Sequence, residues 1–515
     1  MYRTTDTMIR RVLPNGRVPH ICVVGAGISG LRCAEVLAQQ GLKVTILEGR
    51  DRIGGRVHQF SQQGHLIDLG PNWIHGTDHN PILDLAEKLH DTTFSPPEDA
   101  TPSLYDELGK LVDGQTAKKH SELVWEIISN AFKYSRENGP SIPPQSSLMD
   151  FFKSEVKGKN LDDASSKLIF QMARMWGDFV GEPIEKQSLR FFWLEECIEG
   201  ENLFLASTYK SIVELIAKGA LAKAQLELST KVTSFKSNIQ SGQPLSVTIT
   251  TASNDSSSFD EVIVTCPLGW LKRNISSFSP ALPFQITTAI EHISYGRLEK
   301  VYVTFPTAFW LSSNSTETGP AFFSQFLPPS YALDQNPERW TTECVSLASL
   351  PGSCAHPTLL FYFHGPCAQR VTSLIQGLDP ATKEYFFRLD AFFQPYYSLL
   401  PNYSSSSPDC KPSAILVTNW QNDEFAGFGS YTTFQASDPA MDGEVQLDKD
   451  IEALREGCPR RGIWFAGEHT APFVALGTVT GAYWSGESVA KRVAEVYGLG
   501  GGDESEQDST DPRVK

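Results

Sequence analysis

The sequence predicts an α/β protein with at least two domains, on three observations. Residues 20–50 have the pattern of a buried strand, a glycine-rich turn, a helix and a second strand. Short strand patterns separated by polar turns lie between residues 225 and 267, and residues 462–497 again suggest strand, loop and helix. A chain of 515 residues is also too long for one compact core. Between these segments, residues 80–215 show the apolar spacing of helices.

The composition narrows the function classes. Hydrophobic residues make up 40% and charged residues 20%, which is ordinary for a globular protein. The net charge of −16 disfavours a nucleic-acid binder and suits a cationic ligand, although acid kept for solubility would give the same total. The nine cysteines form no CxxC pair, so neither a disulfide framework nor a metal site is predicted.

The first glycine-rich turn predicts a dinucleotide site. Gly25, Gly27 and Gly30 form G-x-G-x-x-G, and Ser29 lies within it. The first glycine permits the tight turn, the second lets a pyrophosphate approach the backbone, and the third lets the helix pack closely. Glu48 ends the next strand, at the distance where a carboxylate accepts the ribose hydroxyls.

A second loop identifies the dinucleotide as FAD. The stretch "GRDRIGGRV" carries Arg50, Gly54, Gly55 and Arg56. Arginine forks suit phosphate oxygens, and paired glycines allow a close backbone approach. A nicotinamide enzyme has no need of this second loop, whereas FAD crosses the chain repeatedly.

With these motifs the sequence resembles the flavin-containing amine oxidase family. The match rests on "VVGAGISGL", "VTILEGRDRIGGRV" and "DLGPNWIHG" near the start and on "WFAGEHT" and "GTVTGAYWSG" near the end. The likeness runs over roughly residues 20–497, and within the family it is greatest to polyamine oxidases of the spermine and N-acetylpolyamine type. The resemblance implies non-covalent FAD and a two-domain architecture like that of p-hydroxybenzoate hydroxylase.

The resemblance also divides the chain. It implies a discontinuous, Rossmann-like FAD-binding domain of residues 1–90, 215–300 and 410–500. Residues 91–214 and 301–409 would form a mixed α+β substrate-binding domain, and the polar residues 501–515 a disordered tail. Neither a secretory signal nor an apolar run long enough for a bilayer is present in the sequence, so a cytoplasmic location without membrane attachment is expected.

The family pattern assigns further positions to FAD: Gly70, Pro71, Asn72, Trp73, Val232, Gly467, Glu468, Thr478 and Val479. The first four match the loop that runs along the flavin ring, and the Val232 backbone matches a contact to adenine. Glu468 matches an acid that bonds a ribitol hydroxyl. Thr478 and Val479 open the last helix, whose N-terminal dipole would stabilise negative charge on the reduced flavin.

Lys300 is the principal catalytic candidate. It heads the strand pattern "EKVYVTFPTAFW", in which Val301, Val303 and Phe305 alternate as on a strand with one buried face. A strand-end lysine is usually solvated. The family pattern instead gives this lysine a water held against flavin N5, and burial would favour its neutral amine.

The substrate walls are assigned to aromatic residues. Trp420 and Tyr431 match positions that flank the substrate over the flavin, where aromatic faces attract a cationic amine. Phe428 and Phe434 are interpreted as core. Thr478 stands where some relatives carry a second tyrosine, so a two-tyrosine sandwich is not expected.

Two assignments stay open. His75, also a catalytic candidate, could bond or tune the distal part of a polyamine, or it could be a satisfied histidine beside the flavin loop. The acids of "WLEECIEGEN" (Glu195, Glu196, Glu199 and Glu201) could meet distal ammonium groups, but a solvated face is favoured.

The implied function is oxidation of a polyamine (spermine, spermidine or an N-acetylated form) at a secondary amine. Hydride would leave the carbon next to nitrogen for flavin N5, and water would split the imine into a shorter amine and an aminoaldehyde. Molecular oxygen would become hydrogen peroxide. The sequence does not tell which polyamine is used, which C–N bond is cut, or the oligomeric state.

Several alternatives have different sequence requirements. A monoamine oxidase would carry a flavin-linking cysteine, and residues 462–486 contain none. A histone demethylase would need inserted domains, for which this length leaves no room. An amino-acid oxidase stays open. A non-enzymatic binding protein on the same scaffold, such as a Rab escort protein, would not keep "RIGGR", "FAGEHT" and Lys300 together.

Overall fold

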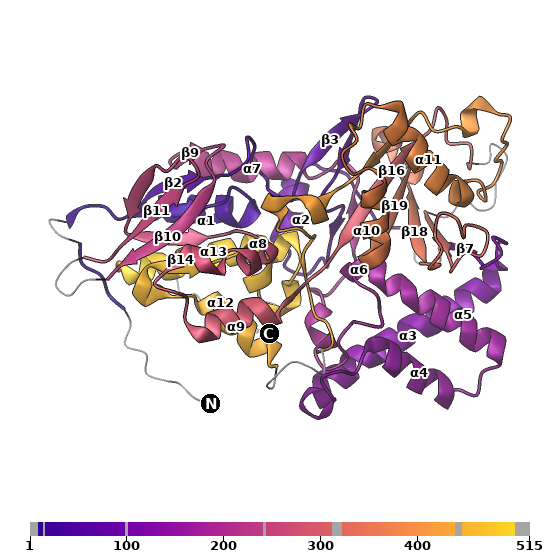
Figure 1. Cartoon of the computed structure of the whole chain (residues 1–515), viewed down its shortest axis with the longest axis horizontal. Coiled ribbons are helices and arrows are strands. Elements are labelled where there is room, and N and C mark those ends of the chain that lie inside the picture. Colours follow the sequence, from indigo (N-terminus) through magenta and orange to yellow (C-terminus); the bar gives the residue numbers. More distant parts are fainter. Residues whose placement is uncertain are drawn as a thin grey trace.

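The computed structural model describes residues 9–13, 16–97, 101–239, 244–311, 322–437 and 445–499. Helices and several sheets alternate along the chain, so the predicted α/β class is confirmed. The two largest sheets lie in opposite halves of an elongated molecule (Figure 1). The tail predicted for residues 501–515 lies outside the described residues.

The first sheet is parallel and carries the glycine-rich turn. Its five strands follow the order β22 (Ile463–Phe465), β13 (Glu261–Val264), β1 (His20–Val24), β2 (Lys43–Leu47) and β9 (Gln225–Glu227). One face is covered by α1 (Ile28–Gln39), which packs against both α7 (Lys210–Leu221) and α13 (Val479–Val496). The central strands β1 and β13 are short apolar runs because both of their faces are buried, whereas the edge strand β9 is mostly exposed.

The other face of this sheet packs on a second, four-stranded sheet. Its order is β12 (Ser256–Phe259), β11 (Ser246–Thr251), β10 (Val232–Asn238) and β14 (Phe278–Ser279). The helices α8 (Leu268–Arg273), α9 (Phe284–His292) and α12 (Leu447–Glu456) close the same core. The strand patterns expected between residues 225 and 267 are therefore confirmed, although they belong to two different sheets.

The third sheet, of six strands, lies in the right half of Figure 1. Its order is β20 (Ala414–Val417), β16 (Leu298–Thr304), β19 (Thr358–His364), β18 (Thr342–Ser346), β17 (Phe323–Phe326) and β7 (Ser103–Tyr105). The helices α10 (Gly365–Leu374) and α11 (Lys383–Tyr397) pack on one face against Val301 and Val303. The opposite face packs Tyr302 against Ile67 and Phe204.

The strand that carries Lys300 is consequently buried on both faces. The alternation of Val301, Val303 and Phe305 predicts one buried face, and that expectation is wrong for this strand. The strand also begins at Leu298, so Lys300 is inside it and not at its head. A strand between two neighbours, covered on both sides, has no solvated face for a lysine to use.

Residues 80–215 are mainly helical, as the sequence predicts. This segment holds α2 (Pro81–Lys88), α3 (Gly114–Asn138), α4 (Leu148–Gly158), α5 (Asp163–Ala173) and α6 (Gly177–Val180), followed by α7. Short strands interrupt it, among them β6 (Thr93–Phe94) and β8 (Leu203–Leu205). Strand β8 pairs with β6 on one side and with β5 (Trp73–Ile74) on the other. Smaller pairs join β3 (Gln59–Gln62) with β4 (His65–Asp68) and β15 (Ser294–Tyr295) with β21 (Thr432–Thr433).

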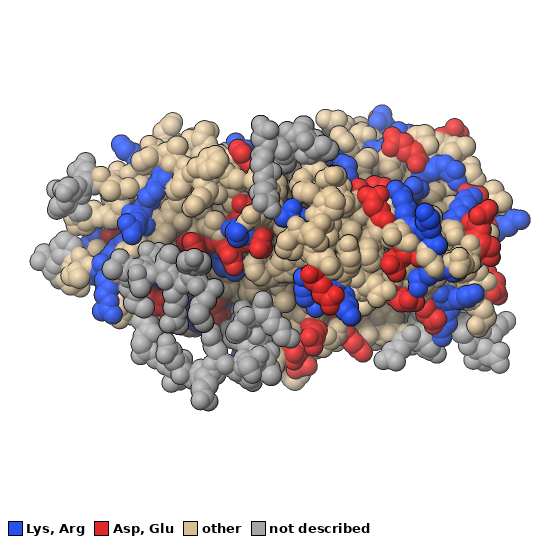
Figure 2. Space-filling model, turned by 90° about the horizontal axis from the view of Figure 1, so that it is seen from below, with Lys and Arg blue, Asp and Glu red and all other residues tan. Residues whose placement is uncertain are grey.

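The surface in Figure 2 mixes Lys and Arg with Asp and Glu and does not gather the basic residues into one patch. Nowhere in the described part of the chain is a helix both long and apolar enough to cross a membrane.

Candidate active site

A cavity of about 850 Å³ runs between the two large sheets. Every residue that the sequence predicts as catalytic or cofactor-binding lines this cavity, except Gly30. Residues from many distant segments thus converge on one enclosed space, whose size suits a large ligand.

The two glycine-rich loops contact each other at one end of the cavity. The Gly54 N–H donates to the Ala26 carbonyl at 2.8 Å, and Gly27 and Gly54 form an isolated parallel bridge. A Cβ on Gly27 would point into open space, whereas one on Gly30 would lie 2.0 Å from the Gly25 carbonyl oxygen. Gly27 therefore leaves room at the cavity, and Gly30 acts through close helix packing, as the motif predicts.

Glu48 organises this end of the cavity. Its side chain is 6% exposed, and its two oxygens accept the Ala26 N–H at 2.7 Å and the Arg50 N–H at 2.8 Å. A carboxylate offers about four lone-pair sites, and these two hydrogen bonds use only two of them. Glu48 can therefore still accept hydrogen bonds from ribose hydroxyls. Glu48 thus holds both glycine-rich loops besides its predicted role.

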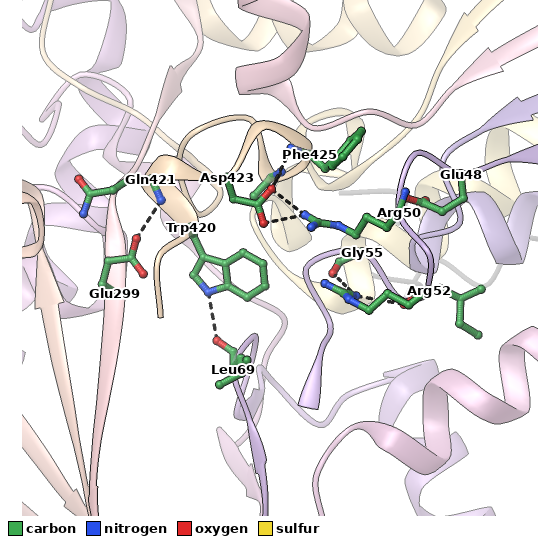
Figure 3. Close-up of polar contacts among 12 residues, drawn as sticks. Glu48, Arg50, Arg52, Gly55, Leu69, Glu299, Trp420, Gln421, Asp423 and Phe425 are labelled. Atoms are coloured by element: carbon green, nitrogen blue, oxygen red, sulfur yellow. Dashed lines mark hydrogen bonds and ion pairs between the residues drawn. The ribbon is translucent and has the colours of Figure 1, made fainter. Parts of the chain in front are cut away.

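The two arginines of the second loop have protein partners. One Arg50 nitrogen contacts both Asp423 oxygens, at 2.9 and 3.0 Å (Figure 3). Arg56 donates to Glu468 at 2.9 Å and to the Ser430 carbonyl at 2.7 Å. Direct contact of either guanidinium with a phosphate stays a prediction, because both already hold loops of the cavity wall together.

The lining fits a bound dinucleotide in two respects. The Ser29 hydroxyl, at the start of α1, is buried and has no hydrogen-bond partner in the described part of the chain, which leaves it available to a phosphate oxygen. The N-termini of α1 and α13 both face the cavity, and α13 begins with Thr478 as a cap that accepts the Gly481 N–H at 2.9 Å. Helix N-termini favour anions.

Glu468 is kept ionised. Burial opposes its charge, but the Arg56 guanidinium more than compensates and lowers the pKa of Glu468. The neighbouring His469 is fully buried, and burial lowers its pKa to about 4, so its ring is neutral.

Lys300 points into the cavity wall and not into solvent. Its amine donates to the Gly70 carbonyl and to Asn72 Oδ1, and it lies 5.7 Å from the Tyr362 ring centre. Burial lowers the pKa of Lys300 to about 7, against the opposing charge of Asp68. The solvated strand-end alternative is therefore excluded, and Lys300 touches the loop that was predicted to run along the flavin ring.

The predicted aromatic walls are held rigidly. Trp420 donates through Nε1 to the Leu69 carbonyl at 3.1 Å, and Glu299 accepts the Gln421 N–H at 2.9 Å beside it (Figure 3). Tyr431 donates its hydroxyl to the Phe179 carbonyl. Both rings line the same cavity as Lys300. Phe434 is buried in the core as expected, whereas Phe428 is half-buried with the Arg273 guanidinium over its ring, so the core interpretation fails for it.

Glu195 corrects one interpretation. It is half-buried and lines the cavity, where its Oε1 accepts the Phe434 N–H and the Thr433 hydroxyl, each at 3.1 Å. Burial raises its pKa to about 7. Glu196 also lines the cavity and pairs with Arg136, whereas Glu199 and Glu201 are exposed, so the expected solvated face holds only for the latter two.

His75 keeps both of its interpretations. Its Nδ1 lies 3.2 Å from Asn202 Oδ1, and burial lowers its pKa, so one nitrogen is held by the protein and the ring tends to be neutral. It lines the cavity, and its predicted part in substrate binding stays a prediction.

Sequence reasoning missed Asp178, Glu343 and Tyr362, which also line the cavity. Glu343 had one visible signal, since an acid inside the apolar strand pattern "TECVS" is unusual without a partner. Asp178 gave none, because its surroundings are assembled from distant strands.

The geometry agrees with comparisons of the sequence. The model of the flavin containing amine oxidoreductase family matches residues 28–494. The chain belongs to this family. As a flavin-containing amine oxidoreductase it uses FAD, and the fit of Ser29 and the two helix N-termini is consistent with that cofactor.

Individual relatives of the flavin-containing amine oxidoreductase are moderately similar. Polyamine oxidase 4 of Oryza sativa subsp. japonica is 28% identical, over 92% of this chain and 88% of its own length. Lysine-specific histone demethylase 1B of Mus musculus is 26% identical over 92% of this chain but only 52% of its own. A corticosteroid-binding protein of Candida albicans is 26% identical over 92% of this chain and 96% of its own.

We expect the FAD of this amine oxidoreductase to be released by acid precipitation. The cysteines that line the cavity in the described ranges are Cys197 and Cys266, and burial raises the pKa of both thiols, to about 12 for Cys197, so neither is a ready nucleophile. All yellow colour should therefore appear in the supernatant. Colour that stays with the precipitated protein would show a covalent link.

Proposed function

We propose that this chain is an FAD-dependent polyamine oxidase that acts on a secondary amine and releases a shorter amine, an aminoaldehyde and hydrogen peroxide. We further propose the Rossmann-like, discontinuous FAD domain of residues 1–90, 215–300 and 410–500, in the p-hydroxybenzoate-hydroxylase-like arrangement. The parallel sheet with its glycine-rich loops supports the first domain. The six-stranded sheet across the cavity supports a substrate domain of residues 91–214 and 301–409, but β20 (Ala414–Val417) and the first three residues of β16 add to that sheet from ranges assigned to the FAD domain.

The observation that carries the proposal is the buried Lys300 in a cavity shared with two fixed aromatic rings and several carboxyl groups. Bound FAD would supply a two-electron acceptor for hydride and pass the electrons to oxygen. An amine held between Trp420 and Tyr431 would be oriented by their faces. Burial favours the neutral amine of Lys300, which would hold a water or exchange a proton at the reacting edge of the ring.

The carboxyl groups favour a cationic substrate over the other ligands that relatives suggest. Glu195, Asp178 and Glu343 all line the cavity. An apolar ligand such as a steroid would leave these buried acids without compensation, which is costly. An ammonium group would instead satisfy them, and a polyamine carries several.

The test is a colour change. Purified protein should be yellow, and spermine, spermidine or an N-acetylated polyamine should bleach it under argon because substrate electrons reduce the flavin. Mass spectrometry of the products then identifies the C–N bond that is cut. Bleaching by an amino acid or a simple monoamine, with none by any polyamine, would contradict the proposal.

A further inference from the structure

The six-stranded sheet presents a polar row to the cavity. Lys300, Tyr362, Glu343 and Gln325 lie directly opposite one another on the neighbouring strands β16, β19, β18 and β17, and all four line the cavity. Neighbouring strands are about 4.8 Å apart, so Glu343 stands roughly 10 Å from Lys300 along this row. The row therefore leads from the proposed reaction centre to an acidic residue.

Asp178 on α6 stands beside the acidic end of the row. It is 6% exposed, and its Oδ1 lies 2.7 Å from His364 Nδ1. Its other oxygen, Oδ2, is buried and accepts no hydrogen bond of good geometry from the described residues, and the residue lines the cavity. The His364 ring packs closely on Gly177, where a Cβ would lie 2.2 Å from His364 Nε2, so this position beside Asp178 needs a glycine.

Glu343 is the second buried acid at this end of the cavity. It is 6% exposed, and among the described residues only its Oε2 has a hydrogen bond, from Gln325 at 2.9 Å. Burial raises its pKa to about 7, with a further contribution from Asp178, and burial likewise raises the pKa of Asp178. The charge of Asp178 thus makes ionisation of Glu343 less favourable, whereas His364 and the Glu343 backbone N–H partly offset the effect of burial on the pKa of Asp178.

Among the described residues, no compensating lysine or arginine is built into this end of the cavity. In the described ranges no lysine or arginine forms an ion pair with either carboxyl, and His364 is the one basic partner, on Asp178. Nor do His, Cys, Asp and Glu in those ranges form a group that could hold a metal ion. Two buried acids open to a cavity, one with an oxygen that accepts no hydrogen bond of good geometry from the described residues, are arranged to receive a small organic cation.

We propose that Asp178 and Glu343 form a subsite that binds an ammonium group of the substrate remote from the carbon that is oxidised. This inference rests on the proposed amine oxidation. Lys300 and Glu343 are two strand spacings apart, roughly 10 Å. The subsite should therefore select amines whose two charged nitrogens are separated by about that distance. A monoamine of the same length would leave both carboxyls uncompensated and would bind more weakly.

The test compares 1,8-diaminooctane with octylamine, which have the same carbon chain and differ in one amine. Binding to the FAD-loaded protein under argon is followed by the change in flavin absorbance and checked by calorimetry. The parent protein should bind the diamine more tightly. Glu343→Gln and Asp178→Asn should each raise the Kd of the diamine at least about tenfold, because an ammonium loses a buried charged partner, and should change that of octylamine by no more than about twofold.

A matched control is Glu185→Gln, which removes one acid from an exposed position that pairs with Arg174. It should leave both Kd values unchanged. Unaltered diamine binding in Glu343→Gln, or an equal loss for octylamine, would overturn the subsite. Glu343→Gln can decide alone if Asp178→Asn does not fold, since the amide keeps the side-chain volume.

The outcomes separate this inference from the proposed function. A parent that prefers the diamine and loses that preference in the variants, yet is bleached by no polyamine, would retain the subsite and refute polyamine oxidation. A parent that is bleached by spermine but whose variants bind the diamine unchanged would retain the oxidation and refute the subsite.

Discussion

Replacing Lys300 with methionine is expected to slow flavin reduction by substrate, reoxidation by oxygen, or both, by at least about tenfold, or roughly 1.4 kcal/mol of barrier. Methionine has a similar length but provides no amine. The Gly70 carbonyl and Asn72 Oδ1 would lose their shared donor, while the strand and its packing remain. Anaerobic and aerobic stopped-flow traces separate the two half-reactions.

The pH dependence gives this variant a second readout. Burial lowers the pKa of Lys300 to about 7 and raises that of its neighbour Asp68 to about 7, so the two groups titrate together and the neutral amine gains as the pH rises through this range. If the neutral amine is the active form, the rate at saturating substrate falls in the parent as the pH drops through about 7. Lys300→Met should lose that limb of the profile.

Lys272→Met is the matched control. This lysine is also partly buried, burial lowers its pKa to about 8, and its amine donates to the Glu291 carbonyl at 2.8 Å, but it does not line the cavity. Its replacement should leave both half-reactions unchanged. Rates in Lys300→Met equal to those of the parent would reduce Lys300 to a structural lysine.

The second large effect is expected at Glu48. Glu48→Ala should weaken FAD binding at least about 100-fold, because hydrogen bonds to a charged group contribute about 1.5–3 kcal/mol each and a ribose offers two hydroxyls. The Ala26 and Arg50 N–H groups would also lose their acceptor, which loosens both glycine-rich loops. Titration of the apoprotein with FAD, followed by fluorescence, measures the change.

The control for this variant is Glu227→Ala. Glu227 ends the neighbouring parallel strand β9 and is paired in register with Leu47, but it is exposed and does not line the cavity. Its removal should leave the Kd for FAD unchanged. Glu48→Ala protein that binds FAD as tightly as the parent would refute the ribose assignment, whatever its catalytic rate.

The FAD end of the cavity was largely predictable from the sequence. Gly25, Gly27, Gly30 and Glu48 lie within one strand–turn–helix–strand unit, where glycine conformations and helix geometry follow local rules. The structure places them as those rules require, and adds only that Glu48 holds the two loops.

The substrate end was predicted only in part. Trp420, Tyr431 and Lys300 were assigned by family resemblance, and they do share one cavity. Glu195 was assigned to a solvated face, because nothing in "WLEECIEGEN" shows that Thr433 and Phe434 approach it from another segment.

By itself the sequence determined the α/β class, the dinucleotide loops and the membership of an amine oxidoreductase family, because these depend on short, contiguous patterns. Only the tertiary structure decided that Lys300 is buried against Gly70 and Asn72, more than two hundred residues away in the chain. It also decided that Asp178 and Glu343 face one cavity in which, of the described residues, His364 is their basic partner. Burial and charge compensation depend on how separate strands and helices assemble, and no local pattern encodes that assembly.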